Sequence, residues 1–357
     1  MRIGLIIFRA ERDRGGAERY TIDLAEELID RGHEVSIVAS CFEDSGRATK
    51  VHVPAIGLTR VARYKRFLAN LRLKEFDIAH TMMPVPGADV YHAHAGIERL
   101  GAPKRFFERK RKLVLSIETT LLQNAHVIVL NRSHSAGIDD IVGAERLHFL
   151  RSTVRFTPVD EADVVDVRRS IHIRHAIDST KPVALFVGND FHRKGLDLAI
   201  TAIAASPHWQ LIVVGTGDSK IYSKQVASLK ITDRVRFAGP TSNVAPYYAA
   251  ADVLLLPARD EPFGMVVTEA MSSGVIPIVA DNVGAAEVIR NGVSGTVLPR
   301  NTPDKWSDAL HRLSTAQLRE PFHRECLLTR HEFSHNAHVD EIESIYTRIV
   351  SQKRSLA

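Results

Sequence analysis

The chain has 357 residues, of which 45% are hydrophobic and 25% charged, and it carries a net charge of +5 at pH 7. This length predicts about two domains, and the composition is ordinary for a globular protein with a large core. Its two cysteines, Cys41 and Cys326, lie far apart in the sequence. They exclude a disulfide framework and a cysteine zinc site, and they fit a reducing compartment.

No export signal is apparent at the start of the chain. The first apolar run, "IGLIIF" (3–8), is followed at once by "RAERDRGG", whereas a signal peptide needs a longer apolar stretch. No run approaches the ~18 apolar residues that span a bilayer. We therefore expect a cytoplasmic protein.

Positive charge is concentrated in one stretch. Between Arg60 and Lys112 there are thirteen Lys or Arg and five Asp or Glu, a local excess of eight positive charges. Because the whole chain carries +5, the remaining residues together carry −3. A basic stretch this local indicates an anionic surface as a partner.

The first part of the chain alternates short apolar runs with amphipathic stretches. Residues 2–8 ("RIGLIIF") predict a buried strand, and residues 15–32 predict a helix that ends at Gly32. Further strands are predicted at 33–40, 76–82 and 125–131. This alternation favours a parallel sheet with helices on both faces.

The alternation restarts after Lys181. Residues 155–181 are polar and poorly periodic apart from one probable helix, so we place a linker near 157–180. Beyond it, apolar runs predict the strands of a second doubly wound sheet at 182–190, 209–218, 235–240, 251–258, 275–280 and 295–299. Two such domains create a cleft, and ligands of open α/β sheets bind at the carboxyl ends of the strands.

Four loops follow predicted strands, and two of them carry glycines or cations at a helix start. In "RDRGGAERY" (12–20), Gly15 and Gly16 precede a helix, where the backbone can approach an anion closely; an ordinary glycine turn explains this motif equally well. In "VGNDFHRKGLDLAI" (187–200), Arg193 and Lys194 could clamp a diphosphate. An isolated Arg-Lys pair is more often solvated, but its position at a strand end favours a ligand.

The third loop, "VVGTGDSK" (213–220), holds a G-x-G without the third glycine of a nicotinamide fingerprint. Gly215 is therefore expected to form a tight turn that lines the cleft.

The fourth loop belongs to "EPFGMVVTEA" (261–270), which sets Glu261 and Glu269 around the start of a helix predicted from about Gly264 to Ser273. Carboxylates accept hydrogen bonds from adjacent sugar hydroxyls. An ordinary helical glutamate would instead leave a charge between two buried runs, which is costly. The amides at the positive end of this helix are expected to face the ligand; they belong to Phe263, Gly264, Met265 and Val266.

Together these motifs resemble the family 4 retaining glycosyltransferases. The resemblance lies in the E-x7-E pattern with "FG" inside it, the "RKG" loop, the early "GG" turn and the strand "AADVLLLPA" (250–258). It covers nearly the whole chain and implies the α/β GT-B fold, with two Rossmann-like doubly wound parallel-sheet domains facing a central cleft. The implied division is an acceptor-binding domain over 1–160, a nucleotide-sugar-binding domain over 161–335, and a helix over 336–357 that packs back towards the N-terminal domain.

The resemblance also implies roles for the motif residues. Glu269 would bind the ribose hydroxyls of a nucleotide-sugar donor, and Glu261 with the amides after it would hold the transferred sugar. Arg193 and Lys194 would neutralise the diphosphate. The glycines expected in the donor site are Gly15, Gly16, Gly188 and Gly215. The family is metal-independent, so neither a metal nor a cofactor is expected.

Within the family, residues 83–100 and 188–200 are most similar to the bacterial lipopolysaccharide-core glucosyltransferases that transfer glucose to the inner heptose. Those enzymes carry an aspartate near the reacting centre where this chain has Ala95. We therefore expect His94 to contact the donor sugar as a catalytic residue, with His92 the next candidate. A structural role for either histidine is nearly as common.

The basic stretch has a role in this interpretation. Residues 60–74 and 102–118 mix cations with apolar side chains, and they suit an anionic membrane surface at the inner face of the cytoplasmic membrane. A solvated basic face is the alternative. The first segment predicts an amphipathic helix with one apolar face formed by Val61, Tyr64, Phe67, Leu68 and Leu71.

The leading hypothesis is a retaining hexosyltransferase that moves glucose from UDP-glucose to a glycolipid or polysaccharide such as the lipopolysaccharide core. A GT-B nucleotide-sugar epimerase is the alternative among enzymes. The basic stretch also fits a nucleic-acid-binding protein, but aromatic residues make up only 6% of the chain and no recognition motif occurs, so nucleic acid is not expected as a partner. The incomplete G-x-G argues against a nicotinamide oxidoreductase.

Overall fold

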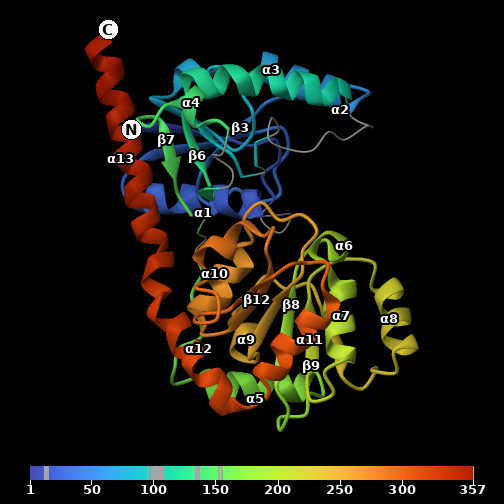
Figure 1. Ribbon diagram of the computed structural model, residues 1–357. Helices are drawn as coiled ribbons and strands as arrows, with labels where there is room; N and C mark the ends of the chain where they lie inside the picture. Colours follow the sequence, from blue (N-terminus) through green and yellow to red (C-terminus); the bar gives the residue numbers. More distant parts are fainter. Residues whose placement is uncertain are drawn as a thin grey trace. The chain divides into compact units, whose positions relative to one another are not determined.

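The structure is a computed structural model, and it describes residues 1–11, 16–94, 96–97, 108–132, 137–151, 153 and 156–356 (Figure 1). Contacts within the chain divide it into two compact units. The first unit comprises residues 1–155 and 335–357, and the second comprises residues 156–334. Each unit is built on its own parallel sheet.

Within the described residues, the first unit holds a seven-stranded parallel sheet in the order β3-β2-β1-β4-β5-β6-β7. The strand order reverses beside β1, which makes the carboxyl ends of β1 and β4 a topological switch point. The strands are β1 (Arg2–Ile6), β2 (Glu34–Ala39), β3 (Thr49–His52), β4 (Ile78–Thr81), β5 (Val90–His92), β6 (His126–Val129) and β7 (Leu147–Phe149).

Helices cover both faces of this sheet, with α1 on one face and α3 on the other (Figure 1). The helices described in this unit are α1 (Gly16–Asp30), α2 (Arg60–Ala69), α3 (Glu108–Asn124), α4 (Asp139–Val142) and α13 (His335–Leu356). The chain's final helix, α13, contacts both α1 and β4. It therefore packs on the same side of the sheet as α1.

The apolar side of α2 belongs to the core of the first unit. Tyr64 and Phe67 are buried in one cluster with residues of α3 and β6, and Leu68 and Leu71 pack against that cluster. The expected amphipathic helix is present, but its apolar face is covered by the protein itself. The outward face of α2 is basic, because Arg60, Arg63, Lys65 and Arg66 are exposed.

The second unit holds a six-stranded parallel sheet in the order β10-β9-β8-β11-β12-β13. Its strands are β8 (Val183–Val187), β9 (Gln210–Val214), β10 (Val235–Gly239), β11 (Val253–Leu256), β12 (Ile276–Ala280) and β13 (Thr296–Leu298). Its helices are α5 (Val164–Arg174), α6 (Phe191–Lys194), α7 (Leu196–Ala204), α8 (Ser219–Ser228), α9 (Ala245–Ala249), α10 (Met265–Ser272), α11 (Pro303–Arg312) and α12 (Ala316–Leu328).

The central strands of this sheet are apolar because helices cover both of their faces. Every residue of β11 and β12 is buried, as expected for a parallel sheet enclosed on both sides. The order reverses between β8 and β11, so the loops after these two strands start side by side at the carboxyl edge. Both units are thus Rossmann-like α/β domains, as the sequence pattern predicted.

The linker expected near 157–180 is wrong, because these residues are part of the second unit. The helix α5 packs against α9, and Nε2 of His172 lies 3.0 Å from the carbonyl oxygen of Ala250. Arg168 pairs with Asp252 at 3.1 Å. The polar composition of this segment reflects an exposed helix face and not a loose connection.

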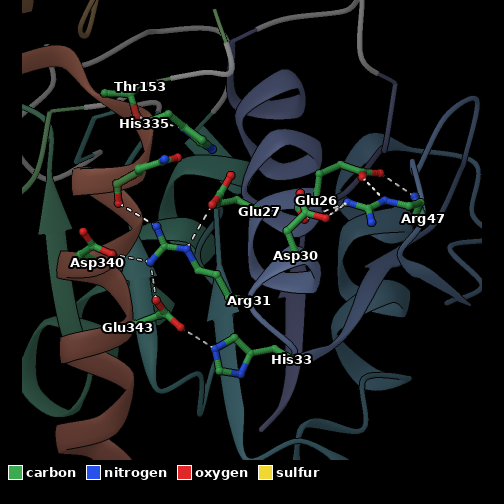
Figure 2. Close-up of polar contacts among 11 residues, drawn as sticks. Glu26, Glu27, Asp30, Arg31, His33, Arg47, Thr153, His335, Asp340 and Glu343 are labelled. Carbon is green, nitrogen blue, oxygen red and sulfur yellow. Dashed lines mark hydrogen bonds and ion pairs between the residues drawn. The ribbon is translucent and has the colours of Figure 1, made fainter. Parts of the chain in front are cut away.

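A network of ion pairs holds the start of α13 in the first unit (Figure 2). Arg31 lies just after α1, and its guanidinium contacts Glu27, Asp340 and Glu343. His33 adds a contact of 2.6 Å to Glu343. Burial alone would raise the pKa of Glu343, but the hydrogen bonds from His33 and Arg31 outweigh it and lower that pKa.

The first unit also contains a buried cluster of histidines and tyrosines. His80 of β4 lies 2.5 Å from the hydroxyl of Tyr346, and the hydroxyl of Tyr20 lies 2.7 Å from His338. The ring of His92 stacks on that of His80, with centroids 5.5 Å apart. Neither ring nitrogen of His92 has a hydrogen-bond partner among the described residues. The cluster joins α1, β4, β5 and α13.

Burial keeps these histidines neutral. It lowers the pKa of His80 and of His338 to about 3, with neighbouring histidines adding to the effect, and it lowers the pKa of His92 well below its ordinary value. The unfolded chain binds these protons near pH 6.5, whereas the folded chain does not. Stability is therefore greatest above pH 6.5 and falls as the pH decreases towards 3.

We predict that acid destabilises the first unit more than the second, because burial lowers the pKa of six described histidines in the first unit and of two, His172 and His175, in the second. As the pH falls from 6.5 to 4, each buried histidine that stays unprotonated reduces the free energy of unfolding by up to ~1.4 kcal/mol per pH unit. Urea unfolding at pH 7.5 and 5.0 tests this by circular dichroism. Tryptophan fluorescence follows the second unit separately, because both tryptophans, Trp209 and Trp306, lie there.

The matched variant is His92→Leu, which removes one titrating ring that has no hydrogen-bond partner among the described residues. It should flatten the pH dependence of the circular-dichroism transition. An equal pH dependence in the wild type and this variant would contradict the prediction.

Candidate functional site

The loop after β8 turns sharply to present two cations. Asp190 begins the single-turn helix α6, and its carboxylate accepts the backbone N–H of Arg193 at 3.0 Å. Gly195 then takes φ +80° between α6 and α7. A side chain at Gly195 would overlap the carbonyl oxygen of Pro257, beyond the end of β11. Only glycine lets this turn pack so closely on the neighbouring loop.

Arg193 and Lys194 meet the same carboxylate oxygen of Glu261. Nη1 of Arg193 lies 3.1 Å from Oε2 of Glu261, and Nζ of Lys194 contacts that oxygen too. Lys194 and Glu261 are buried, at 8% and 9% exposure, whereas the Arg193 side chain is 38% exposed. Asp190, 3.9 Å from Arg193, is itself exposed and screened by solvent. Two cations therefore share one buried carboxylate, which leaves excess positive charge for an anion.

The loop of Glu261 is anchored to the loop after β12. Glu261 forms a parallel bridge with Val283, and its carbonyl oxygen accepts the N–H of Gly284 at 3.1 Å. The carbonyl oxygen of Phe263 accepts the N–H of Ala285 at 2.7 Å. These bonds fix the carboxylate of Glu261 in place through its own backbone.

The helix after this loop begins with Gly264, which has φ +93° and caps α10. Met265 and Val266 form its partly exposed first turn. The first N–H groups of a helix have no partner within it, and they favour negative charge nearby. Glu269, one turn further, is buried at 5% exposure, and Oε2 accepts a hydrogen bond from the hydroxyl of Tyr248 at 2.9 Å.

Two glycines allow close packing near Lys194: Gly188 lies next to the lysine side chain, and Gly215 lies next to Gly188. A side chain at Gly188 would come within 2.8 Å of Cγ of Lys194, so its absence makes room for the lysine. Gly215, with φ +123°, packs its Cα against the carbonyl group of Gly188. Gly188 therefore adjoins Lys194 directly, and Gly215 packs behind Gly188. The tight turn expected at Gly215 stays a prediction.

Known proteins share both units. Residues 14–137 match the family described as Glycosyltransferase Family 4, and residues 167–337 match Glycosyl transferases group 1. The chain carries both domains of a family 4 glycosyltransferase. The lipopolysaccharide glucosyltransferase WaaG of Escherichia coli is 27% identical over 310 residues, covering 80% of this chain and 82% of WaaG.

Solved structures show the same fold for this glycosyltransferase. The crystal structure of WaaG, a glycosyltransferase involved in lipopolysaccharide biosynthesis, matches with a TM-score of 0.82 at 23% identity, over 97% of this chain and 99% of that one. Anabaena HepE in complex with UDP and glucose matches with a TM-score of 0.77 at 18% identity, over 97% and 99% of the two chains. The fold is therefore GT-B, as the sequence motifs implied.

The remaining predicted site residues of the glycosyltransferase lie in the first unit. His94 follows β5 and is partly exposed, and its ring packs 4.3 Å from that of Tyr20. Burial lowers the pKa of His94 to about 3, so the ring is neutral at pH 7. His92 is fully buried, and its ring stacks on that of His80 inside the first unit. Gly16 is the first residue of α1, whereas Gly15 and Ala95 lie outside the described residues.

Arg259 is a residue of this site that the sequence motifs did not indicate. Its guanidinium forms two hydrogen bonds to Asp197 of α7, at 2.8 and 2.7 Å, and one to the carbonyl oxygen of His192 at 2.6 Å. Its backbone N–H donates to the carbonyl oxygen of Arg193 at 2.7 Å. Arg259 thus holds the turn that carries both cations. The available signal was a single arginine three residues after the end of β11, and its position alone does not reveal its partner.

Across the described ranges, no group of three or more His, Cys, Asp or Glu side chains is arranged to hold a metal ion. None of the helices in the described part of the chain is long and apolar enough to span a bilayer.

We predict that Gly195→Ala disrupts the cation loop. The new methyl group would overlap the carbonyl oxygen of Pro257 and displace Arg193 and Lys194. Gly292→Ala is the matched control, because Gly292 also has positive φ, at +78°, but nothing lies within 4 Å of the added Cβ. Both variants bear the ~1–2 kcal/mol cost of a left-handed alanine. Overlap should cost Gly195→Ala a further ~1–3 kcal/mol.

Chemical denaturation measures both variants. A free energy of unfolding that falls equally in the two would show that the turn does not need this close contact.

Proposed function

We propose that this glycosyltransferase transfers a hexose, with glucose from UDP-glucose as the favoured donor, to a glycolipid or polysaccharide such as the lipopolysaccharide core. The observation that carries the proposal is the cluster of Arg193 and Lys194 on Glu261, beside the start of α10. Support for the sugar and acceptor comes from the similarity to WaaG, a lipopolysaccharide glucosyltransferase, and to HepE, solved with UDP and glucose.

In this proposal the two cations neutralise the diphosphate of the donor. Charge builds up on the leaving diphosphate as the bond to the sugar breaks, and preorganised cations stabilise that charge without reorganisation. Arg193 supplies a fork of donors and Lys194 a point charge. Protein cations replace the charge that a metal would supply, so we propose that transfer needs no metal. Chelation with EDTA should leave the rate unchanged.

Glu261 and Glu269 have separate roles in the proposal. When the phosphate oxygens of the donor pair with Arg193 and Lys194, the carboxylate of Glu261 can accept hydrogen bonds from the hydroxyls of the sugar. Glu269, further along α10, binds the ribose. His94 contributes a neutral ring that contacts the donor sugar. The acceptor hydroxyl attacks from the face that the diphosphate leaves, and the anomeric configuration is retained.

We predict that Lys194→Ala reduces sugar transfer by ~10²-fold or more, because it removes one preorganised charge. The control is Lys181→Ala, which removes an exposed lysine of the same unit that pairs with Asp178 at 3.6 Å. Transfer is measured with radiolabelled UDP-glucose and purified acceptor glycolipid. Near-normal turnover of the Lys194 variant would contradict the proposed role.

The donor is identified by thermal shift with UDP-, GDP-, ADP- and TDP-sugars, since a ligand that binds the folded state raises the melting temperature. We expect UDP-glucose to give the largest shift. Product analysis by NMR then tests the reaction itself. An α-linked product from an α-linked donor shows retention, whereas a converted nucleotide sugar formed without acceptor would identify an epimerase instead.

We also propose that the protein binds an anionic membrane surface through the first unit. The basic outward face of α2 adjoins a loop in which Ile56 and Leu58 are 84% and 104% exposed. Apolar side chains beside a basic face suit the headgroup region of an anionic bilayer. This surface would place the enzyme at a glycolipid acceptor.

Vesicle flotation tests the membrane proposal. Arg63→Ala with Arg66→Ala should weaken binding to phosphatidylglycerol vesicles by about tenfold or more, since each cation contributes ~1 kcal/mol. Ile56→Ser with Leu58→Ser should weaken it too. Ile173→Ser, at a position in the second unit that is 71% exposed, is the control. Unchanged flotation of the first two variants would contradict the proposed surface.

A further inference from the structure

A buried tyrosine holds the carboxylate of Glu269. The hydroxyl oxygen of Tyr248 lies 2.9 Å from Oε2 of Glu269 and 3.2 Å from the carbonyl oxygen of Val266, in the first turn of α10. A hydroxyl has one proton, and a carboxylate is a stronger acceptor than a peptide carbonyl. The shorter contact, to Glu269, is therefore the one that receives the proton.

Tyr248 is too deeply buried to touch a ligand. It lies in α9 with no exposed surface, and its ring packs edge to face on Phe156, with centroids 5.6 Å apart. Glu269 keeps a small exposed fraction of 5%. The Tyr248 hydroxyl can therefore affect a ligand only through a partner, and Glu269 is the partner that it contacts most closely.

The physical benefit of this contact is preorganisation. A glutamate side chain loses rotamer freedom when it is fixed, and that loss opposes binding if it occurs only when the ligand arrives. To accept hydrogen bonds from two adjacent hydroxyls, its carboxylate must be held in one orientation. Tyr248 fixes that orientation before a ligand arrives, and it occupies one of about four acceptor positions of the carboxylate.

We propose that Tyr248 is a positioning residue for the nucleotide: it orients Glu269 to accept hydrogen bonds from the ribose hydroxyls, and it thereby sets the preference for a ribonucleotide. This inference rests on the proposed function, in which Glu269 binds the ribose of the donor. The inference adds Tyr248, which does not contact the nucleotide itself, and it makes the preference for ribose over deoxyribose depend on this residue.

Calorimetric titration with UDP and with 2′,3′-dideoxyuridine 5′-diphosphate tests this role. Tyr248→Phe should weaken UDP binding by about tenfold, the effect of one hydrogen bond to a charged group. It should leave binding of the dideoxy nucleotide unchanged. The matched control is Tyr247→Phe, because Tyr247 is the neighbouring buried tyrosine and its hydroxyl lies 3.4 Å from His175, away from Glu269. This control should bind both nucleotides as the wild type does.

The possible results separate the inference from the proposed function. An equal loss for both nucleotides, or no loss for UDP, overturns the positioning role while UDP binding by the wild type leaves the proposed function standing. A wild-type protein that binds neither nucleotide overturns both.

A second comparison covers the case in which Tyr248→Phe does not fold because its buried carboxylate has lost this hydrogen bond. Glu269→Ala, with and without Tyr248→Phe, removes the carboxylate that accepts the Tyr248 hydrogen bond. If Tyr248 acts through Glu269, the single and double variants bind UDP equally. A further loss in the double variant overturns the inference.

Discussion

The candidate site depends on one buried carboxylate that holds two cations. Lys194 is almost fully buried, and a buried ammonium group is costly unless an opposite charge compensates it. Glu261 provides that charge and meets Arg193 through the same oxygen. The loops after β8 and β11 must therefore meet at one edge of the sheet.

The supporting contacts come from glycines and from one arginine. Gly188 leaves space for the stem of Lys194, Gly215 lets its own loop pack on the backbone of Gly188, and Gly195 allows the turn to lie on Pro257. Arg259 binds the turn from the opposite loop, through carbonyl oxygens and Asp197. These residues fix where the charges are, and this is what electrostatic stabilisation of a departing diphosphate requires.

The fold was largely predictable because apolar runs of five or more residues, such as "VALFV" and "IPIVA", mark buried parallel strands. Three strands of the first unit were not predicted: β3 and β7 are short and largely not buried, so no apolar run marks them, and β5 has only three residues. The helix α5 was expected as part of a linker, since its sequence is polar and its packing against α9 has no sequence signal. Helix α10 was expected from about Gly264 to Ser273 and runs from Met265 to Ser272.

The site was predictable as a set of residues and not as a geometry. Strand-end position and residue type indicated Arg193, Lys194, Glu261 and Glu269. That Glu261 pairs with both cations follows from the adjacency of β8 and β11, although β9 and β10 lie between them in the sequence. Tyr248 and Arg259 could not be identified, because their partners are distant in the chain. The roles assigned to all six stay predictions.

A crystal structure of the protein with UDP bound tests the central claim most directly. The account predicts diphosphate oxygens on the side chains of Arg193 and Lys194, with the ribose hydroxyls on Glu269. A nucleotide bound elsewhere in the molecule, with both cations still paired to Glu261 and no phosphate near them, would contradict it.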